Sequence, residues 1–273
     1  MSKIKLNDKK FLSNVYTIIG IVGSVASIVS LVITMPGWWK LVSLFVVLVP
    51  FFIVLLMYIS VSRKKSARFR INQTEINIFE GDIFKEEPNS INVIPFNEYF
   101  DTTVDDKIIA ERSLHGMYIK KYWNGREEEL SNIIKNDFIL NKSKTTFNSN
   151  REVGNKQKYE LGSMISIKNF VLTALTHFDE DNRAYLSFSD YICFLVSFWK
   201  HIDVIYANRV INIPIFGSGI TRINDKKVTI ELLLETILWS IKDSSFQGKK
   251  INILVYKEDL YKIDFYHLEP KIY

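Results

Sequence analysis

The chain contains a single cysteine, Cys193, and only four histidines, and this scarcity narrows the chemistry it can perform. One cysteine forms no internal disulfide, which suits a reducing compartment. The histidines, His115, His177, His201 and His267, are scattered without the spacing that metal ligands show. We therefore expect no metal and no cofactor. We also expect Cys193 to be buried, because it falls on the apolar stripe of a predicted helix.

A basic surface for nucleic acid is also lacking. The net charge is +5, but residues 1–70 hold ten Lys/Arg and one acidic residue, Asp8. The rest of the chain holds 25 basic and 29 acidic residues. A nucleic-acid-binding domain should show a basic footprint, so we expect no nucleic acid partner.

Two long apolar runs stand at the start of the chain, Val15–Met35 and Leu41–Val61, separated by Pro36–Lys40. Each run has about twenty residues without a charge, the length that crosses roughly 30 Å of hydrocarbon. The sequence therefore predicts a cytoplasmic basic N-terminus over residues 1–14 and a transmembrane helical hairpin over residues 15–61. A cleaved signal peptide is the competing interpretation of the first run, but its length and the second run argue against it.

Lys and Arg residues flank both outer ends of this hairpin, whereas the turn has only Lys40. Such an excess marks the cytoplasmic side, so we expect a two-span protein of the inner or plasma membrane with both termini cytoplasmic. Gly20, Gly23, Ser24 and Ser27 form a stripe of small residues along the first helix. This stripe packs the two helices of one chain together, or it packs neighbouring chains into a homo-oligomer; both interpretations stay open.

After a basic linker over residues 62–72, residues 73–273 alternate between strand and helix patterns, which predicts a three-layer α/β/α domain. Apolar periodicity predicts helices over 188–202 and 230–241, the first with a capping box at Ser187 and Asp190. Residues 142–158 are polar and are expected to form a surface loop or flexible hairpin. Strands are expected at Glu75–Phe79, Ile91–Phe96, Met164–Ile167, Phe170–Thr176, Val210–Ile215 and Ile251–Tyr256.

Three strand ends carry residues suited to binding a nucleotide. The strand before Pro214 leads into Gly217-Ser218-Gly219, where backbone N–H groups can approach phosphate oxygens closely. This spacing fits neither a Walker A loop nor a nucleophile elbow. Another strand ends in Gly81-Asp82, and a third ends in Asn97. Each loop alone is equally consistent with a plain turn.

In this order and spacing, the three loops resemble those of a macro domain, the ADP-ribose-binding module, over about Asn77–Tyr256. The resemblance implies a mixed central sheet. It also implies that Asp82, with Ile83 beside it, contacts the adenine amine and that Asn97 lies near the distal ribose. The diphosphate would lie on the backbone of the phosphate loop, and Tyr256 or Tyr261 would stack on adenine. The phosphate loop comprises Pro214, Gly217, Ser218, Gly219, Ile220 and Thr221.

Catalytically active macro domains usually carry a glycine-rich loop after the asparagine. Here residues 99–107 contain no glycine, so we expect a binding protein rather than an enzyme. The acidic residue Asp101 in this loop would read an amino-bearing group of a ligand that differs from plain ADP-ribose, or it would belong to a solvated face.

A macro domain behind an apolar hairpin is similar to the membrane-bound effectors of Thoeris-type bacterial antiphage defence. This resemblance implies a sensor of an ADP-ribose-derived signal, such as histidine–ADP-ribose, made from NAD by a partner TIR-domain enzyme. Binding would trigger self-association, membrane disruption and abortive infection. The alternatives are a membrane-tethered ADP-ribosyl hydrolase or phosphoesterase and a passive reader of ADP-ribosylated partners.

Overall fold

The computed structural model describes residues 8–32, 39–62, 64–85, 87–137, 139–219, 221–223, 228–244, 246 and 248–268. The chain divides into two compact units, Met1–Lys64 and Lys65–Tyr273, and each is considered by itself.

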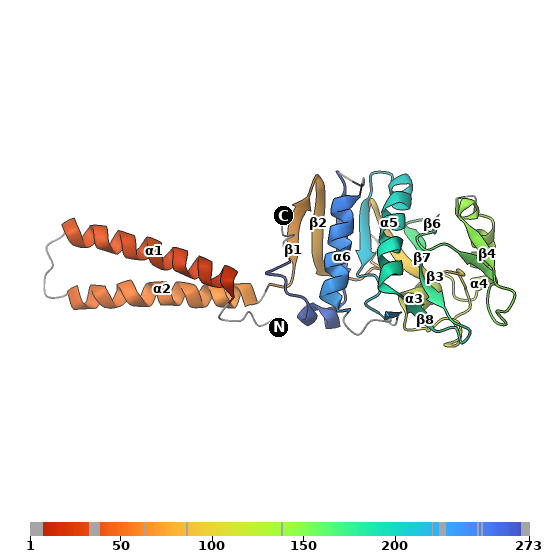
Figure 1. The fold of residues 1–273 in the computed structure, drawn as a ribbon, viewed down its shortest axis with the longest axis horizontal. Helices are drawn as coiled ribbons and strands as arrows, with labels where there is room; N and C mark the ends of the chain where they lie inside the picture. Colours follow the sequence, from red (N-terminus) through yellow and green to blue (C-terminus); the bar gives the residue numbers. More distant parts are fainter. Residues whose placement is uncertain are drawn as a thin grey trace. The chain divides into compact units, whose positions relative to one another are not determined.

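The first unit is a hairpin of two helices, α1 (Lys9–Val32) and α2 (Trp39–Ser62), as Figure 1 shows. The rings of Phe11 and Tyr58 meet edge to face, with 5.7 Å between their centroids. Pro50 lies inside α2. The two helices thus coincide with the two apolar runs, while the turn residues Pro36, Gly37 and Trp38 lie outside the described residues.

Within the described part of the chain, no helix combines the length and the apolar character that crossing a membrane requires. The prediction of a transmembrane hairpin over residues 15–61 is therefore not supported.

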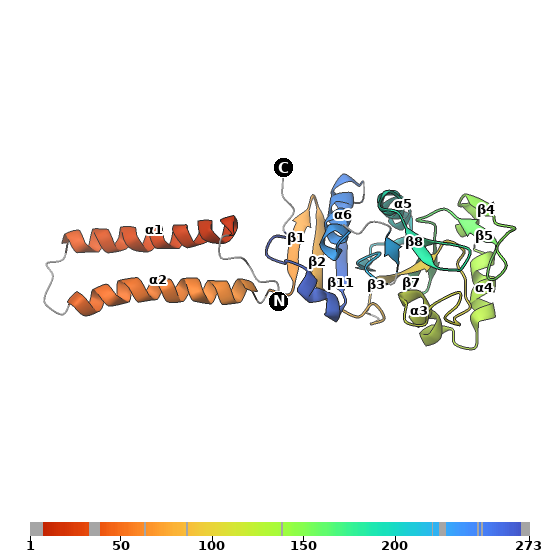
Figure 2. The same cartoon turned by 60° about the horizontal axis from the view of Figure 1, so that its bottom comes forward.

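The second unit is built on a mixed sheet of nine strands among the described residues (Figures 1 and 2). The strand order is β1-β2-β11-β9-β3-β7-β8-β10, and β6 pairs with β7 beside this path. These strands are β1 (Ala67–Ile71), β2 (Thr74–Glu80), β3 (Ser90–Asn97), β6 (Met164–Ile167), β7 (Phe170–Phe178), β8 (Ala184–Leu186), β9 (Val210–Pro214), β10 (Arg222–Ile223) and β11 (Lys250–Val255). A separate two-stranded hairpin consists of β4 (Thr145–Phe147) and β5 (Gln157–Tyr159).

Helices cover both faces of the sheet, and each face has its own apolar core. On one face α5 (Phe188–Ile205) and α6 (Ile230–Asp243) pack against residues such as Val93 and Ile213. On the other face α3 (Leu114–Tyr122) and α4 (Glu127–Lys135) pack against residues such as Ile94 and Leu172. Neighbouring residues of β3 thus point to opposite layers, as strand geometry requires, and the three-layer α/β/α architecture is confirmed.

A ladder of asparagine side chains crosses four strands of this sheet. The Nδ2 of Asn212 donates to Oδ1 of Asn92 at 2.7 Å, and Asn252 donates to Asn212 at 2.8 Å. Asn77 then donates to Asn252 at 3.1 Å. These four residues are register partners on β3, β9, β11 and β2. The ladder fixes the alignment of the strands, because a shift by one residue would leave buried amides unpaired.

The six strands and two helices expected from the apolar patterns are all present, and Ser187 caps α5 by accepting from the N–H of Asp190 at 3.0 Å. The α/β unit begins earlier than expected, because β1 lies inside the range predicted as a linker. The prediction that Cys193 is buried is wrong. The buried stripe of α5 runs through Phe194, Leu195 and Phe198, and Cys193 lies exposed beside it.

Candidate functional site

Five adjacent strands end at the same edge of the sheet. β2, β11, β9, β3 and β7 are all mutually parallel, so the loops that follow Glu80, Val255, Pro214, Asn97 and Phe178 meet there. This is the edge at which α/β sheets bind ligands. Because neighbouring strands lie about 4.8 Å apart, the ends of β2 and β3 are separated by roughly 14 Å. The structure therefore brings the three predicted loops together in one row.

The loop after β2 carries an exposed carboxylate. Asp82 is exposed, and its Oδ1 accepts from the N–H of Phe84 at 2.9 Å, while Ile83 is buried beneath it. A Cβ on Gly81 would lie 2.7 Å from Cδ2 of Leu254, so glycine allows this turn to approach β11 closely. The second carboxylate oxygen of Asp82 therefore remains suited to accepting from a ligand amine.

An exposed aromatic ring follows the neighbouring strand. Tyr256 comes directly after β11, caps the short helix η2 (Lys257–Lys262), and has 64% of its surface exposed. Tyr261, the other predicted stacking residue, lies on η2 and is 60% exposed. Since β11 pairs with β2, Tyr256 and Asp82 follow adjacent strand ends.

The loop after β9 crosses the edge of the sheet. Pro214 is buried at the end of β9, and the chain re-enters the sheet as β10, which pairs with β8 beyond β3 and β7. The described loop residues 215–219 and Thr221 thus connect β9 to a strand on the far side of β3 and β7. In this loop Gly217 has φ +78°, a conformation that favours glycine, and the N–H of Ser218 donates to the carbonyl of Ile215 at 3.2 Å.

Gly219 is the open position of this loop. A Cβ built on it meets no atom of the described chain within 4 Å. The N–H of Ser218 closes the turn, so the N–H groups of Gly217 and Gly219 are the better candidates for holding a phosphate. Thr221 is half-buried, and Ile220 lies outside the described residues.

The loop after β3 is organised around Asn97. The Oδ1 of this buried side chain accepts from the N–H of Tyr99 at 3.1 Å and of Asp101 at 3.2 Å. Its Nδ2 donates to Oδ2 of Asp101 at 2.9 Å. Phe100, between them, has φ +48°, which is unusual for a residue with a Cβ. Among the described contacts, one N–H of the Asn97 amide remains for a ligand.

Asp101 is paired with a residue that the sequence did not single out, Arg151. The two side chains are 2% and 4% exposed and are joined at 2.7 Å between Nη2 and Oδ2 and at 3.1 Å between Nη1 and Oδ1. Arg151 lies in the segment expected to be a surface loop, between β4 and β5. No sequence pattern points to this pair, because its members are fifty residues apart in irregular segments.

A second ionic group, at the ends of β3 and β7, was also not predicted from the sequence. The fully buried Glu98 is 2.5 Å from Nδ1 of His177 and 3.0 Å from Nζ of Lys158. Burial acts to lower the pKa of Lys158, but the hydrogen bond and charge of Glu98 outweigh it, so this pKa is raised. His177 also lies 3.8 Å from Asp190. The buried carboxylate is thus compensated within the protein.

His115 supports the Asn97 loop from α3. Its Nε2 lies 2.9 Å from the carbonyl oxygen of Asp101, and its ring stacks against Phe96 with 3.5 Å between centroids. Burial lowers the pKa of His115 to about 3, although the hydrogen bond to Asp101 acts in the opposite direction. The neutral ring must therefore carry its proton on Nε2 to donate to this carbonyl.

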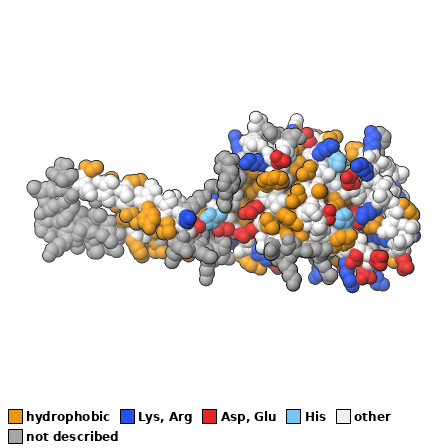
Figure 3. Space-filling view, in the orientation of Figure 1, with side chains coloured by type: hydrophobic (Ala, Val, Ile, Leu, Met, Phe, Trp, Pro, Cys, Tyr) orange, Lys and Arg blue, Asp and Glu red, His pale blue; other side chains and the backbone are white. Residues whose placement is uncertain are grey.

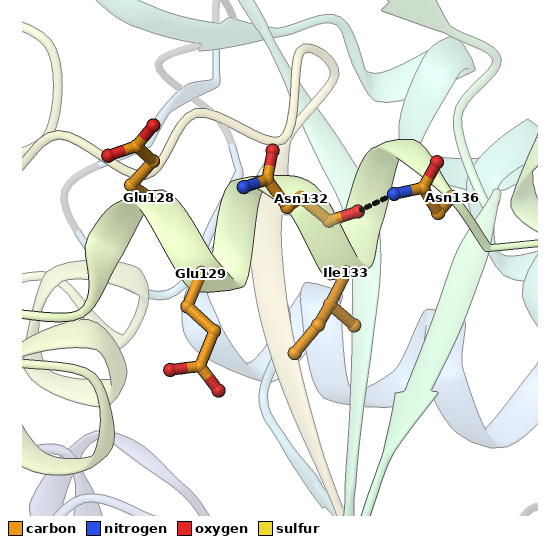
Figure 4. Close-up of a pocket in the computed structure, with 5 residues that line it drawn as sticks. All are labelled: Glu128, Glu129, Asn132, Ile133 and Asn136. Carbon is orange, nitrogen blue, oxygen red and sulfur yellow. Dashed lines mark hydrogen bonds between the residues drawn. The ribbon is translucent and has the colours of Figure 1, made fainter.

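A shallow hollow elsewhere on the surface shares no residue with this edge. It is lined by Glu128, Glu129, Asn132, Ile133 and Asn136, all on α4 or its C-cap, as Figure 4 shows. The lining residues come from one helix only, so this is a helix face and not a cleft between elements.

Comparison with known proteins identifies the family of the chain. Residues 76–256 match the family model described as Thoeris protein ThsA, Macro domain. The chain is also 38% identical over 222 residues to the Thoeris protein ThsA of Bacillus amyloliquefaciens strain Y2, across 80% of this chain and 74% of that protein.

Among solved structures, the chain is similar to a macrodomain of Oceanobacillus iheyensis. The form with ADP is 13% identical at a TM-score of 0.46, across 73% of this chain and 92% of the other. A mutant form with ADPR is 15% identical at a TM-score of 0.46, across 73% and 94%. Both TM-scores are below 0.5, so the assignment to a family depends only on the family model and on the relative from Bacillus amyloliquefaciens.

Proposed function

The chain belongs to the Thoeris ThsA family and carries its macro domain, and from this premise we propose that the carboxyl edge of its sheet binds an ADP-ribose-derived signal nucleotide. The chain would then serve as a sensor and effector in antiphage defence, downstream of a TIR-domain enzyme that makes the signal from NAD.

The order of the loops along the edge is the observation that carries this proposal. Asp82 and Tyr256 follow the adjacent strands β2 and β11, the open backbone at Gly219 follows β9, and Asn97 ends β3. Adenine, diphosphate and distal ribose follow one another in the same order in ADP-ribose. A carboxylate for an exocyclic amine, backbone N–H groups for phosphate and an amide for a hydroxyl match those groups in turn.

We propose that this edge of the sheet binds the nucleotide and does not hydrolyse it. Residues 99–107 contain no glycine, and the buried ionic groups nearby, Asp101 with Arg151 and Glu98 with Lys158, are paired with each other. A hydrolase needs a base within reach of water or substrate. The alternative is an ADP-ribosyl hydrolase that uses His177, because a carboxylate at Nδ1 orients this ring in the manner of a catalytic dyad.

The experiment is calorimetric titration of the full-length chain with ADP-ribose, comparing Gly219→Glu with Gly219→Gln. Both side chains enter open space, but only glutamate places a negative charge beside the diphosphate. We expect Gly219→Glu to abolish binding and Gly219→Gln to retain more of it. Equal affinity of wild type and Gly219→Glu would refute the proposal. Release of ADP-ribose from an ADP-ribosylated protein incubated with the chain, lost in His177→Gln, would instead favour the hydrolase.

The N-terminal hairpin is the effector part of this proposal. Its described apolar side chains include several that are exposed, among them Ile21, Ile28, Phe51 and Phe52. Figure 3 shows hydrophobic side chains at the surface of this part of the chain. Exposed apolar surface of this extent is typical of association with other chains or with lipid. We propose that the bound nucleotide favours a self-associated state of these helices that acts at the cell membrane. Cell fractionation tests the location, since recovery of the chain in the soluble fraction only would refute a membrane role.

A further inference from the structure

Arg151 joins three loops that are far apart in the sequence. Its guanidinium donates to Asp101 in the loop after β3, to Oδ1 of Asn182 in the β7–β8 turn at 2.7 Å, and to the carbonyl of Asn155 in its own hairpin at 2.5 Å. Its Cζ also lies 3.9 Å from the centroid of the Tyr99 ring. The side chain is therefore the point at which the β4–β5 hairpin is fastened to the edge of the sheet.

The same contacts determine how Asn97 is held. Both oxygens of Asp101 are occupied: Oδ2 by Asn97 and Arg151, and Oδ1 by Arg151 and the N–H of Asn155. The acceptor positions of this buried carboxylate are therefore occupied, and its charge is compensated by Arg151, so it is not available to bind a ligand. Its role is to anchor the Asn97 amide, and Arg151 in turn anchors Asp101.

The backbone around this pair is shaped to fit it. Gly154 has φ +92°, and a Cβ on it would lie 2.7 Å from Oδ1 of Asp101 and 2.9 Å from Cζ of Arg151. Asn182 has φ +57° in the turn that meets the guanidinium from the other side. Two turns with left-handed residues thus close around one ion pair.

We propose that Arg151 is a positioning residue for the distal end of the nucleotide site, where it holds Asp101 and, through Asp101, the side-chain amide of Asn97. The proposal rests on the proposed function. Comparing ADP-ribose with ADP tests the distal end of the site by itself, because ADP retains adenine and diphosphate but lacks the distal ribose.

The test titrates the full-length chain, as wild type and as Arg151→Lys, with ADP-ribose and with ADP. Lysine keeps the charge but cannot make the forked contact with Asp101. We expect Arg151→Lys to weaken ADP-ribose binding about tenfold to a hundredfold, the effect of losing a charge-assisted hydrogen bond, and to change ADP binding by less than about twofold. Lys156→Gln, which removes a charge from the exposed part of the same hairpin, should change neither affinity.

Asn182→Gly is a milder second variant, because glycine accepts the positive φ while removing the amide that holds the guanidinium. Like Arg151→Lys, it should weaken the binding of ADP-ribose and not that of ADP, but by a smaller factor. Circular dichroism should show native folding. If Arg151→Lys and Asn182→Gly weaken ADP and ADP-ribose equally, or neither, the positioning role is overturned. If the wild type binds neither ligand, the proposed function itself fails, and the positioning role with it.

Discussion

At the scale of single residues, His115 shows how burial fixes a protonation state. The neutral ring donates from Nε2 to the carbonyl of Asp101 and lies against Phe96. Its pKa is about 3 in the folded chain because burial disfavours the charged ring, against an ordinary value of 6.5. The ring is therefore neutral in the folded chain at neutral pH.

This depressed pKa predicts loss of stability in mild acid. Between pH 6.5 and about 3 the unfolded chain binds a proton that the folded chain excludes, so acid favours unfolding. The contribution is fully present above pH 6.5 and falls by up to about 1.4 kcal/mol per pH unit below it. Urea unfolding from pH 7 to pH 4 should show a shallower pH dependence in His115→Gln than in wild type. His201→Gln, on the exposed surface of α5, should keep the wild-type slope; a full slope in His115→Gln would contradict the assignment.

Adding a methyl group is expected to lower the stability of the protein at one glycine and to have little effect at another. A Cβ on Gly116, in α3, would lie 2.3 Å from the carbonyl oxygen of Ala110, whereas one on Gly219 meets nothing described within 4 Å. We expect Gly116→Ala to lower the free energy of unfolding by about 1–3 kcal/mol, the usual effect of overpacking, and Gly219→Ala to change it by less than about 0.5 kcal/mol. Thermal denaturation of both variants measures this, and equal melting temperatures would show that α3 can shift to accept the methyl group.

At the scale of elements, the asparagine ladder stabilises the register of the sheet. Asn212 is one of its two inner members, so Asn212→Ala leaves Oδ1 of Asn92 and Nδ2 of Asn252 without these partners. Each buried group left unpaired costs about 1–3 kcal/mol, so we expect a loss of about 2–4 kcal/mol. Asn77→Ala, at the part-buried end, should cost about 1 kcal/mol. Urea unfolding compares the two variants, and a similar loss in both would show that the amides do not act as a connected ladder.

The elements that could be predicted from the sequence are those with strong apolar patterns. Strands such as β11 and helices such as α5 bury nearly continuous apolar runs or a clear stripe, so their periodicity identifies them. The short helices α3 and α4 each bury only a few residues, and β4 and β10 are two or three residues long. Such elements depend on tertiary contacts for their formation, and a local pattern does not reveal them.

The residues of the candidate site also fall into those that the sequence predicts and those that it does not. Gly81, Asn97 and the loop around Gly217 could be predicted because glycines and terminal polar residues mark strand ends in the sequence. Arg151 could not be predicted, because an arginine in a polar segment gives no sign of burial. Its partner Asp101 lies on another loop, and only the folded chain brings the two together. This ion pair is the basis of our proposal that Asp101 anchors the side chain of Asn97.

At the scale of the whole molecule, the proposed function requires that nucleotide binding in one unit changes the association of the other. A ligand can shift a chain toward a self-associated state only if it binds that state more tightly. The small-residue stripe of α1 is the surface that we propose for such association. A Cβ on Gly20 or Gly23 meets no described atom within 4 Å, and the hydroxyl of Ser24 donates to the carbonyl of Gly20 in its own helix. Small residues allow the backbones of two helices to approach closely, so the stripe is suited to contacts between neighbouring chains.

The double variant Gly20→Leu/Gly23→Leu tests this last step. A Cβ at either position meets no described atom within 4 Å and leucine favours helix, so α1 should keep its helicity, but the larger side chains would hold the helices of neighbouring chains apart. We expect ADP-ribose to increase the assembled mass of the wild type, measured by mass photometry, and not that of the variant. Calorimetry should give the same affinity for the unassembled chain in both. Val25→Leu, an exposed substitution on the same helix, is the matched control and should assemble normally. Nucleotide-dependent assembly of the double variant would show that chains associate through another surface.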